Sequence, residues 1–200
     1  MISAVVLAAG ESRRMGRKKE TLPVRGEPMV RGVVTKLLES AKIDEVIVVL
    51  GHQADDVGAA LAGVADERIE LVGNRRYREG MGTSLAHGVS SCSWGSGAFV
   101  IVLADAPFFR TEDVDALIDA HAAGNRIVVP ARAGRRGHPA IIDGSFRDEL
   151  EALSGDAGGR HLLERHADSV FELELEDEGF LVDVDTPDDY EAVKDGIDSR

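Results

Sequence analysis

The chain has 200 residues, of which 44% are hydrophobic and 30% are charged, proportions that favour one folded domain over residues 1–200 and exclude a fibrous or largely disordered protein. The 23 basic and 36 acidic residues give a formal net charge of -13, which argues against nucleic acid or an anionic membrane as a partner. No apolar run reaches the roughly 20 residues of a membrane span, and no basic leader precedes the first apolar run, so we expect a cytoplasmic protein. The single cysteine, Cys92, is interpreted as a small buried hydrophobic residue.

Short apolar runs alternate along the chain with segments of helical spacing. Residues 2–9 are continuously apolar, as in a parallel strand that is covered on both faces. Similar runs follow at residues 45–50, 69–72, 98–103 and 126–130. This alternation predicts βαβ units and therefore an α/β fold with a parallel sheet.

Two of the intervening segments predict amphipathic helices. Residues 28–40 place Pro28 in a first turn, and residues 111–122 begin at Thr111, which suits an N-cap. Apolar side chains repeat along one face of each predicted helix, at Val30, Val33, Val34, Leu37 and Leu38 in the first and at Val114, Leu117 and Ile118 in the second. Helices of this kind return the chain for the next parallel strand.

After residue 130 the pattern loosens and is interpreted as an elaboration of the same domain. The predicted elements are an apolar stretch at 140–142, a helix-like run at 146–153, edge strands at 170–175 and 180–184, and a last helix that begins at Thr186-Pro187.

The loop after the first strand carries the strongest functional pattern. Residues 7–19 read LAAGESRRMGRKK, and ligands of open parallel sheets bind at the carboxyl ends of the strands. A turn of small residues can direct several backbone N–H groups at an anion, and Arg14 and Lys19 are suited to neutralise a triphosphate. The loop has neither the spacing of a Walker P-loop nor that of a dinucleotide-binding turn. It therefore predicts a phosphate-binding site of another kind.

A carboxylate stands at the same predicted edge of the sheet. Asp105 comes just after the apolar run 98–103, where it can hold Mg²⁺ together with phosphate oxygens and water. A divalent ion and cationic side chains supply most of the acceleration in phosphoryl-type transfer. Asp105 is therefore our first candidate metal ligand.

Residues 7–19 resemble the LAAGxSxRMGxxK signature of the MobA-like nucleotidyltransferases, closest to their molybdenum cofactor cytidylyltransferase branch. Further segments that resemble motifs of this family follow in order across nearly the whole chain: 79–85 (EGMGTSL), 103–107 (LADAP), 137–139 (GHP), 155–160 (GDAGGR) and 183–187 (DVDTP). The resemblance implies a Rossmann-like three-layer αβα nucleotidyltransferase fold with a mostly parallel sheet. It also implies a reaction that joins a nucleotide to a phosphorylated acceptor and releases pyrophosphate.

The resemblance implies roles for individual residues. Arg14 contacts the β- and γ-phosphates and Lys19 lies near the α-phosphate, with Lys18 as the alternative to Lys19. Asp105 completes the expected catalytic set with Arg14 and Lys19. The nucleotide-binding residues that it implies are Leu7, Ala8, Ala9, Gly10, Ser12, Arg14, Lys19 and Ser84.

Metal and acceptor sites follow from the same resemblance. Mg²⁺, with Mn²⁺ as the alternative, is held by Asp105 and Asp185, and Asp183 is the substitute for Asp185. His138 and Asp156 are expected at the acceptor. Asp185 and Thr186 equally suit the start of a helix, and His138 equally suits an ordinary turn, so the structural interpretation stays open for each.

The choice of nucleotide rests on one methyl group. The guanylyl branch of the family usually reads LAGG where this chain has Ala9, which favours CTP over GTP. The GHP segment also favours CTP. The resemblance implies molybdopterin as the acceptor and a recipient molybdoenzyme as a further partner. The alternatives are GTP with molybdopterin, another nucleotide with a sugar or alcohol phosphate, and a carrier that binds molybdenum cofactor without catalysis.

Overall fold

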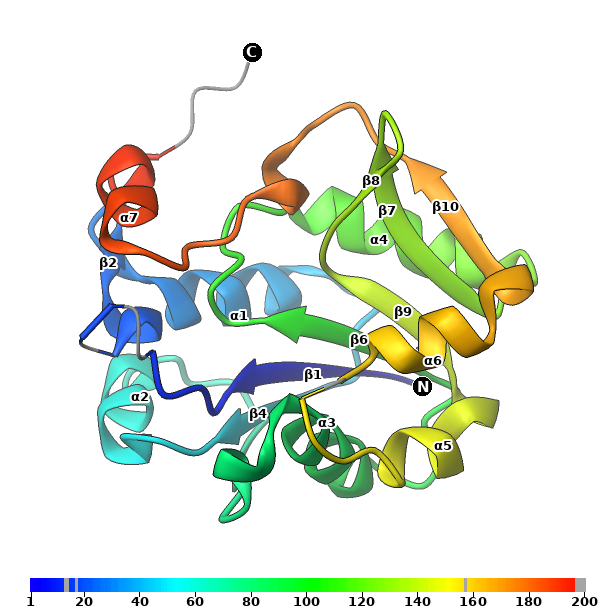
Figure 1. Ribbon diagram of the computed structural model, residues 1–200, viewed down its shortest axis with the longest axis horizontal. Coiled ribbons are helices and arrows are strands. Elements are labelled where there is room, and N and C mark those ends of the chain that lie inside the picture. Colours follow the sequence, from blue (N-terminus) through cyan, green and yellow to red (C-terminus); the bar gives the residue numbers. More distant parts are fainter. Residues whose placement is uncertain (13–14, 17, 157, 197–200) are drawn as a thin grey trace.

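The computed structural model describes residues 1–12, 15–16, 18–156 and 158–196, and its central sheet has helices on both faces (Figure 1). The strands are β1 Ile2–Ala8, β2 Pro23–Val24, β3 Glu27–Pro28, β4 Glu45–Leu50, β5 Ile69–Gly73, β6 Ala98–Leu103, β7 Ile127–Arg132, β8 Arg135–Arg136, β9 Ala140–Asp143 and β10 Val170–Glu174. The helices are α1 Met29–Glu39, α2 Ala54–Leu61, α3 Met81–Ser91, α4 Thr111–Ala122, α5 Arg147–Glu151, α6 Arg160–Arg165 and α7 Pro187–Val193. Short 3₁₀ turns are η1 Lys19–Thr21, η2 Tyr77–Glu79, η3 Gly144–Phe146, η4 Ala167–Ser169 and η5 Gly179–Leu181.

The main sheet is mixed but mostly parallel, with the strand order β10-β7-β9-β6-β1-β4-β5 and with β8 paired to β7. Strand β1 lies between β4 and β6 and runs parallel to both. Strand β9 runs antiparallel to β6 and β7. The expected α/β fold with a mostly parallel sheet is confirmed. Among the described residues, no helix is both long and apolar enough to cross a membrane.

Two apolar clusters fill the two sides of the sheet. Alternate residues of the central strands point to opposite faces, so that Val6 packs in one cluster and Val5 in the other. Helices α1, α2 and α4 contribute to the first cluster, and α3, α5 and α6 contribute to the second. Both faces of the parallel strands are therefore covered, which explains their continuous apolar sequence.

A third apolar cluster attaches the C-terminal helix to the loop after β1. It consists of Met15, Leu22, Met29, Phe108, Val184, Tyr190 and Val193. The Tyr190 hydroxyl donates a hydrogen bond of 2.8 Å to the Pro23 carbonyl in the β2–β3 hairpin. Helix α7 begins at Pro187 with Thr186 as its N-cap, as predicted. The cluster fixes the segment before α7 beside the carboxyl end of the sheet.

Two local predictions are wrong. Residues 180–184 were expected to form an edge strand, but η5 occupies their first part and no strand pairs with them. Their backbone groups bond to loops instead, since Phe180 O accepts from His138 N and Val184 N donates to Asp105 O. Thr111 was expected to cap α4, yet the N-cap is Arg110, and Thr111 Oγ1 donates to Lys36 O on α1.

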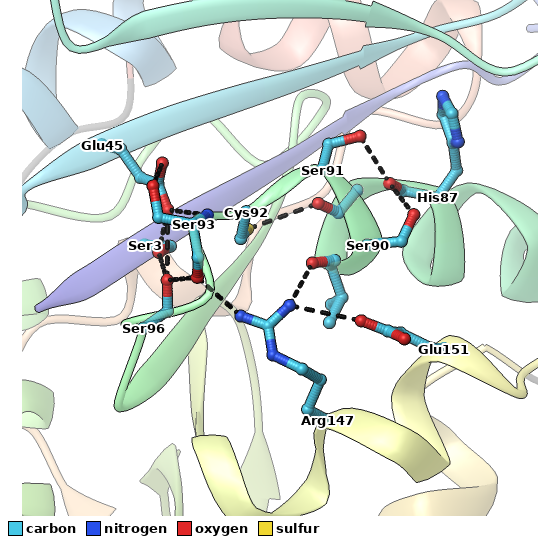
Figure 2. Close-up of polar contacts among 12 residues, drawn as sticks. Ser3, Glu45, His87, Ser90, Ser91, Cys92, Ser93, Ser96, Arg147 and Glu151 are labelled. Carbon is cyan, nitrogen blue, oxygen red and sulfur yellow. Dashed lines mark hydrogen bonds and ion pairs between the residues drawn. The ribbon is translucent and has the colours of Figure 1, made fainter.

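A polar cluster at the opposite end of the sheet joins β1, β4 and the segment after α3 (Figure 2). The Glu45 carboxylate accepts hydrogen bonds from the hydroxyls of Ser3, Ser93 and Ser96 and from the backbone N–H of Ser93. Arg147 donates hydrogen bonds to the carbonyl oxygens of Val89 (3.0 Å) and Ser93 (2.8 Å). Its side chain thereby caps the C-terminal end of α3.

Cys92 lies beside this cluster and is 4% exposed. Burial, followed by the negative charge of Glu45, raises the pKa of its thiol to about 12. The interpretation of Cys92 as a buried small residue is confirmed.

The Glu45 cluster makes stability depend on pH. Burial alone would raise the pKa of Glu45, but its hydrogen bonds outweigh this effect and lower the pKa below its ordinary value. A carboxyl group with a lowered folded-state pKa stabilises the fold above its unfolded pKa of about 4.3, and this contribution is lost as pH falls through the folded-state pKa. We predict that Glu45→Gln lowers the free energy of unfolding by about 1–2 kcal/mol at pH 7. The difference in the free energy of unfolding between Glu45→Gln and the native chain becomes smaller below about pH 4.

Urea denaturation from pH 7 to about pH 3.5 measures both effects. Glu67→Gln is the control, because Glu67 is exposed. Equal stability of the native chain and Glu45→Gln at pH 7 would contradict the assignment.

Candidate active site

A cavity of about 530 Å³ lies at the carboxyl ends of β1 and β6. Its lining residues are Leu7, Ala9, Gly10, Glu11, Ser12, Lys19, Glu20, Tyr77, Arg78, Gly80, Met81, Ser84, Leu103, Asp105, Asp156, Asp183 and Asp185. They come from the end of β1 and the loop after it, from η2 and the start of α3, from the end of β6, from the loop before α6 and from the segment before α7. This is the edge of a parallel sheet where ligands bind.

Lys19 is the charged centre of this cavity. It begins η1, and its side chain is 11% exposed. The ammonium forms ion pairs with Asp105 and with Asp185, the latter at 2.7 Å. Burial alone would lower the pKa of Lys19, but the two carboxylates outweigh burial and raise it. Lys19 therefore stays protonated at neutral pH.

Asp183 adds a third carboxyl group to this region. It keeps contact with solvent, yet protein atoms surround it closely enough to restrict its hydration. This partial burial, followed by the charges of Asp105 and Asp185, raises the pKa of Asp183 to about 6. Asp183 therefore lies within electrostatic range of Asp105, Asp185 and Lys19.

Backbone hydrogen bonds hold the carboxylates in register. Val184 N donates to Asp105 O at 2.9 Å, and Ala104 N donates to Leu7 O at 3.2 Å. Val184 is fully buried in the third apolar cluster. The flanking Asp183 and Asp185 therefore stay beside the end of β6.

The carboxylates fit a divalent ion that prefers oxygen ligands. Asp105 and Asp185 each direct an oxygen at one cation, Lys19 Nζ. Mg²⁺ is commonly held by one or two carboxylates together with phosphate oxygens and water. The described residues contain no group of three or more His, Cys, Asp or Glu side chains arranged as a metal site. The arrangement therefore suits a metal that arrives with phosphate ligands.

Ser84 lies at the second wall of the cavity, in the first turns of α3. It is 4% exposed, and its hydroxyl accepts a hydrogen bond of 3.0 Å from Asn74 Nδ2. Asn74 Oδ1 in turn accepts from Arg76 N. Asn74 therefore fixes the wall that carries Ser84, a role that residue spacing alone did not reveal.

Close backbone contacts bring Asp156 to the cavity. Gly80 has φ +114°, and a Cβ at this position would lie 2.2 Å from Gly155 C. Gly82 N donates to Gly155 O at 2.8 Å. Only glycine permits this approach, which explains the glycines on either side of Met81.

A second cavity of about 620 Å³ adjoins the first, with Leu7, Met81, Leu103 and Asp156 lining both. Its apolar lining residues include Leu85, Ile101, Val129, Ile142 and Leu163. His138 also lines it, and the buried Nδ1 atom of His138 has no hydrogen-bond partner in the described part of the chain. Burial lowers the pKa of His138, so its ring is neutral at neutral pH.

The structure brings most of the predicted site residues together. Leu7, Ala9, Gly10, Ser12, Lys19, Ser84, Asp105, Asp156 and Asp185 all line the first cavity. His138 lines the second, and Ala8 lines neither because its side chain is fully buried in the core. Arg14 lies outside the described residues.

Residue spacing left Lys18 open as the alternative to Lys19, and the structure separates the two. Lys18 is 3% exposed and lies beneath the loop, whereas Lys19 faces the carboxylates. Residue spacing also did not identify Tyr77 and Arg78 as lining residues. Their position directly before the EGMGTSL segment was the available signal.

Comparisons with known proteins agree with this geometry. A family model described as the MobA-like NTP transferase domain matches residues 4–170. Nicotine blue oxidoreductase of Paenarthrobacter nicotinovorans is 34% identical over 194 residues, which cover 92% of each chain. Purine catabolism protein PucB of Bacillus subtilis is 33% identical over 198 residues, which cover 95% of this chain and 94% of PucB.

Solved structures show the same fold. Rv0371c of Mycobacterium tuberculosis superposes with a TM-score of 0.82 at 29% identity and covers 96% of this chain and 97% of its own. A nucleotidyl transferase of Methanothermobacter thermautotroptrophicus gives a TM-score of 0.81 at 25% identity, with 97% and 96% covered. A complex of Rv0371c with manganese gives a TM-score of 0.76 at 28% identity, with 96% and 97% covered. The expected nucleotidyltransferase fold is confirmed.

The carboxylates around Lys19 predict metal binding. We expect Asp105→Asn and Asp185→Asn each to raise the dissociation constant for Mn²⁺ by about tenfold or more, since each change removes a charged oxygen ligand. Electron paramagnetic resonance of free Mn²⁺ during a titration measures this constant. Asp188→Asn is the control, because Asp188 is exposed in the first turn of α7. Native affinity in both site variants would rule out the two ligands.

Proposed function

We propose that this chain, a nucleotidyltransferase that belongs to the MobA-like NTP transferase domain family, transfers CMP from CTP to the terminal phosphate of molybdopterin and releases pyrophosphate. The observation that carries the proposal is the position of Lys19 between Asp105 and Asp185, beside a loop of small residues at the end of β1. A lysine and carboxylates that meet at one point suit a polyphosphate substrate that carries a divalent ion.

The proposed reaction is an in-line displacement at the α-phosphorus. An oxygen of the acceptor's terminal phosphate attacks and forms a new P–O bond, while the bond from the α-phosphorus to the bridging oxygen of the β-phosphate breaks. Pyrophosphate leaves with that electron pair. The attacking oxygen is already anionic, so no general base is required.

The residues of the chain bind and orient the reacting groups. Lys19 places a fixed positive charge beside the α-phosphate, where negative charge is redistributed in the transition state. Asp105 and Asp185 are the residues that would hold Mg²⁺, which would neutralise phosphate oxygens when bound. Restricted hydration of these side chains strengthens the electrostatic interactions.

Ala9 supports a pyrimidine nucleotide. It is 4% exposed and lines the first cavity. The backbone at Gly51 approaches it so closely that a Cβ at Gly51 would lie 2.8 Å from the Cβ of Ala9. The methyl group of Ala9 thus packs against the Gly51 backbone in the wall of the cavity, and the preference for CTP over GTP follows from the resemblance of Ala9 to the cytidylyl branch.

The second cavity supports a phosphorylated acceptor that carries both apolar and polar groups, because the charged side chains of Arg136, Asp156, Arg160 and Glu164 line it together with its apolar residues. The arginines can bind anionic or carbonyl oxygens of an acceptor, and neutral His138 lies in the same wall. Asp156, which lines both cavities, lies where acceptor and nucleotide meet. These features support a phosphorylated acceptor, and the choice of molybdopterin among such acceptors follows from the family resemblance.

The names of the two curated relatives describe an oxidoreductase and a purine catabolism protein. Related chains with one fold can carry different activities, so the site decides the assignment. Here the combination of Lys19, Asp105 and Asp185 supports nucleotidyl transfer, because it provides charges that a nucleoside triphosphate requires.

Selective stabilisation by nucleotides tests the substrate. We expect CTP with Mg²⁺ to raise the melting temperature more than ATP, GTP or UTP does, and to do so only weakly without Mg²⁺. A nucleotide at 100 times its dissociation constant adds about 2.7 kcal/mol to stability, which is about 5–10 °C for a chain of this length. Differential scanning fluorimetry measures the shift.

Pyrophosphate release with CTP, Mg²⁺ and molybdopterin then tests turnover. Selective stabilisation by GTP would replace CTP by GTP in the proposal. Binding of molybdopterin without pyrophosphate release would overturn the enzyme and support the carrier.

His138 provides a test of the acceptor site. We predict that His138→Phe raises the KM for molybdopterin by about tenfold, since one hydrogen bond in a water-excluded pocket is lost, and that it leaves the KM for CTP unchanged. Steady-state pyrophosphate release measures both constants. His161→Phe on α6 is the matched control, because the side chain of His161 is 65% exposed. A rise in the KM for CTP alone would place His138 in the nucleotide site instead.

A further inference from the structure

A buried ion pair lies directly under the loop that lines the first cavity. The side chains of Lys18 and Glu20 are 2% and 4% exposed, and Lys18 Nζ lies 3.3 Å from Glu20 Oε1. Lys18 Nζ also donates to the carbonyl oxygens of Ala8 (3.1 Å) and Gly10 (2.7 Å). The three donors of the ammonium group are therefore matched by three acceptors.

Glu20 connects this ion pair to Lys19. Its Oε2 atom accepts a hydrogen bond of 3.0 Å from Ser12 Oγ, and Ser12 Oγ accepts one of 3.2 Å from Lys19 N. The chain of contacts thus runs from Lys18 through Glu20 and Ser12 to the backbone of Lys19. We call these four residues the loop brace.

The backbone of the loop is strained where the brace holds it. Ser12 has φ +49°, in the left-handed region that residues other than glycine rarely adopt. Such a conformation persists only when its surroundings fix it, and it is concentrated at functional sites. The hydrogen bond from Ser12 Oγ to Glu20 is one contact that fixes it.

The brace also binds two backbone carbonyl groups at the start of the loop. The carbonyl oxygens of Ala8 and Gly10 would repel a polyphosphate, and both are engaged by the buried ammonium of Lys18. A well-packed apolar pair often stabilises a fold as well as a buried ion pair does. A requirement for one particular loop conformation explains the charges better than a need for stability does.

We propose that Lys18 and Glu20 are positioning residues that hold the loop after β1, and with it Lys19, in the conformation that binds the polyphosphate of the nucleotide. This role rests on the proposed nucleotidyl transfer. Lys18 and Lys19 are neighbours in sequence but act differently, since Lys19 faces the substrate and Lys18 shapes the loop from below.

The experiment compares loop function with fold stability. The double variant Lys18→Met/Glu20→Leu replaces the ion pair by apolar side chains and leaves no buried charge unpaired. We expect it to stay folded by urea denaturation, yet to bind inorganic tripolyphosphate with Mg²⁺ about tenfold more weakly or worse, because misplaced donors lose much of their effect. Isothermal titration calorimetry measures the affinity. In turnover, we expect the KM for CTP to rise and the KM for the acceptor to stay unchanged.

Two further variants separate positioning from structure. Arg147→Met removes another poorly exposed cation that binds two backbone carbonyls, at the opposite end of the sheet, and should leave tripolyphosphate affinity unchanged. Lys18→Arg retains the charge and should recover part of the affinity that the double variant loses. A folded double variant with native tripolyphosphate affinity would overturn the proposal.

Tripolyphosphate binding requires neither an acceptor nor turnover, so the two proposals can fail separately. If the native chain binds tripolyphosphate through an intact brace but releases no pyrophosphate, the proposed function fails and the brace stands. If the native chain turns over and the double variant does so with the same KM for CTP, the brace fails alone. Absence of tripolyphosphate binding in the native chain would overturn both.

Discussion

The candidate site depends on one backbone hydrogen bond, from Val184 N to Asp105 O at 2.9 Å. It joins the segment before α7 to the end of β6, although these parts are far apart in sequence. The fully buried side chain of Val184 holds the same junction from the apolar side, within the cluster that α7 shares with the β2–β3 hairpin. Because side chains alternate along an extended segment, burying Val184 leaves Asp183 and Asp185 on the side of the first cavity, where Asp185 pairs with Lys19. A C-terminal helix that looks peripheral in the fold therefore controls the geometry of the carboxylates.

Sequence patterns predicted the parts of this protein that depend on local or periodic physics. The central strands were recognisable because parallel strands buried on both faces need continuous apolar sequence, and Glu45–Leu50 and Ala98–Leu103 match their predicted bounds. Asp105 was recognisable from its place after a buried strand, and the family resemblance added Lys19 and Asp185 to the same site. Spacing could not distinguish Lys18 from Lys19, because the distinction depends on whether a buried carboxylate, Glu20, lies beneath the loop. The segment 180–184 was misleading because its apolar sequence also suits a strand. In the structure, loops rather than a neighbouring strand bond to its backbone.

The EGMGTSL segment both packs closely against the loop before α6 and carries a side chain that lines the first cavity. Gly80 and Gly82 allow the start of α3 to touch the backbone at Gly155, while Ser84 two residues later faces the first cavity. The same contact places Asp156 on the boundary between the two cavities. A side chain at position 80 would push these walls apart, because its Cβ would collide with the backbone of Gly155. The positive φ of the backbone at this position also favours glycine. The walls of the two cavities thus share one contact between α3 and the loop before α6.

The charge of the site explains why metal and nucleotide should bind as one unit. The acidic lining residues of the first cavity are Glu11, Glu20, Asp105, Asp156, Asp183 and Asp185. Within the described part of the chain, Lys19 and Arg78 are the cationic lining residues; Arg14, which is expected at the phosphates, lies outside that part. This excess of acidic side chains, in a protein whose formal net charge is already -13, opposes the charge of a bare triphosphate. A divalent ion changes this repulsion into attraction. The carboxylates then become ligands of the ion, and the ion neutralises the phosphate groups. On the proposed function, the acidic lining therefore favours a polyphosphate that carries its metal over one that does not.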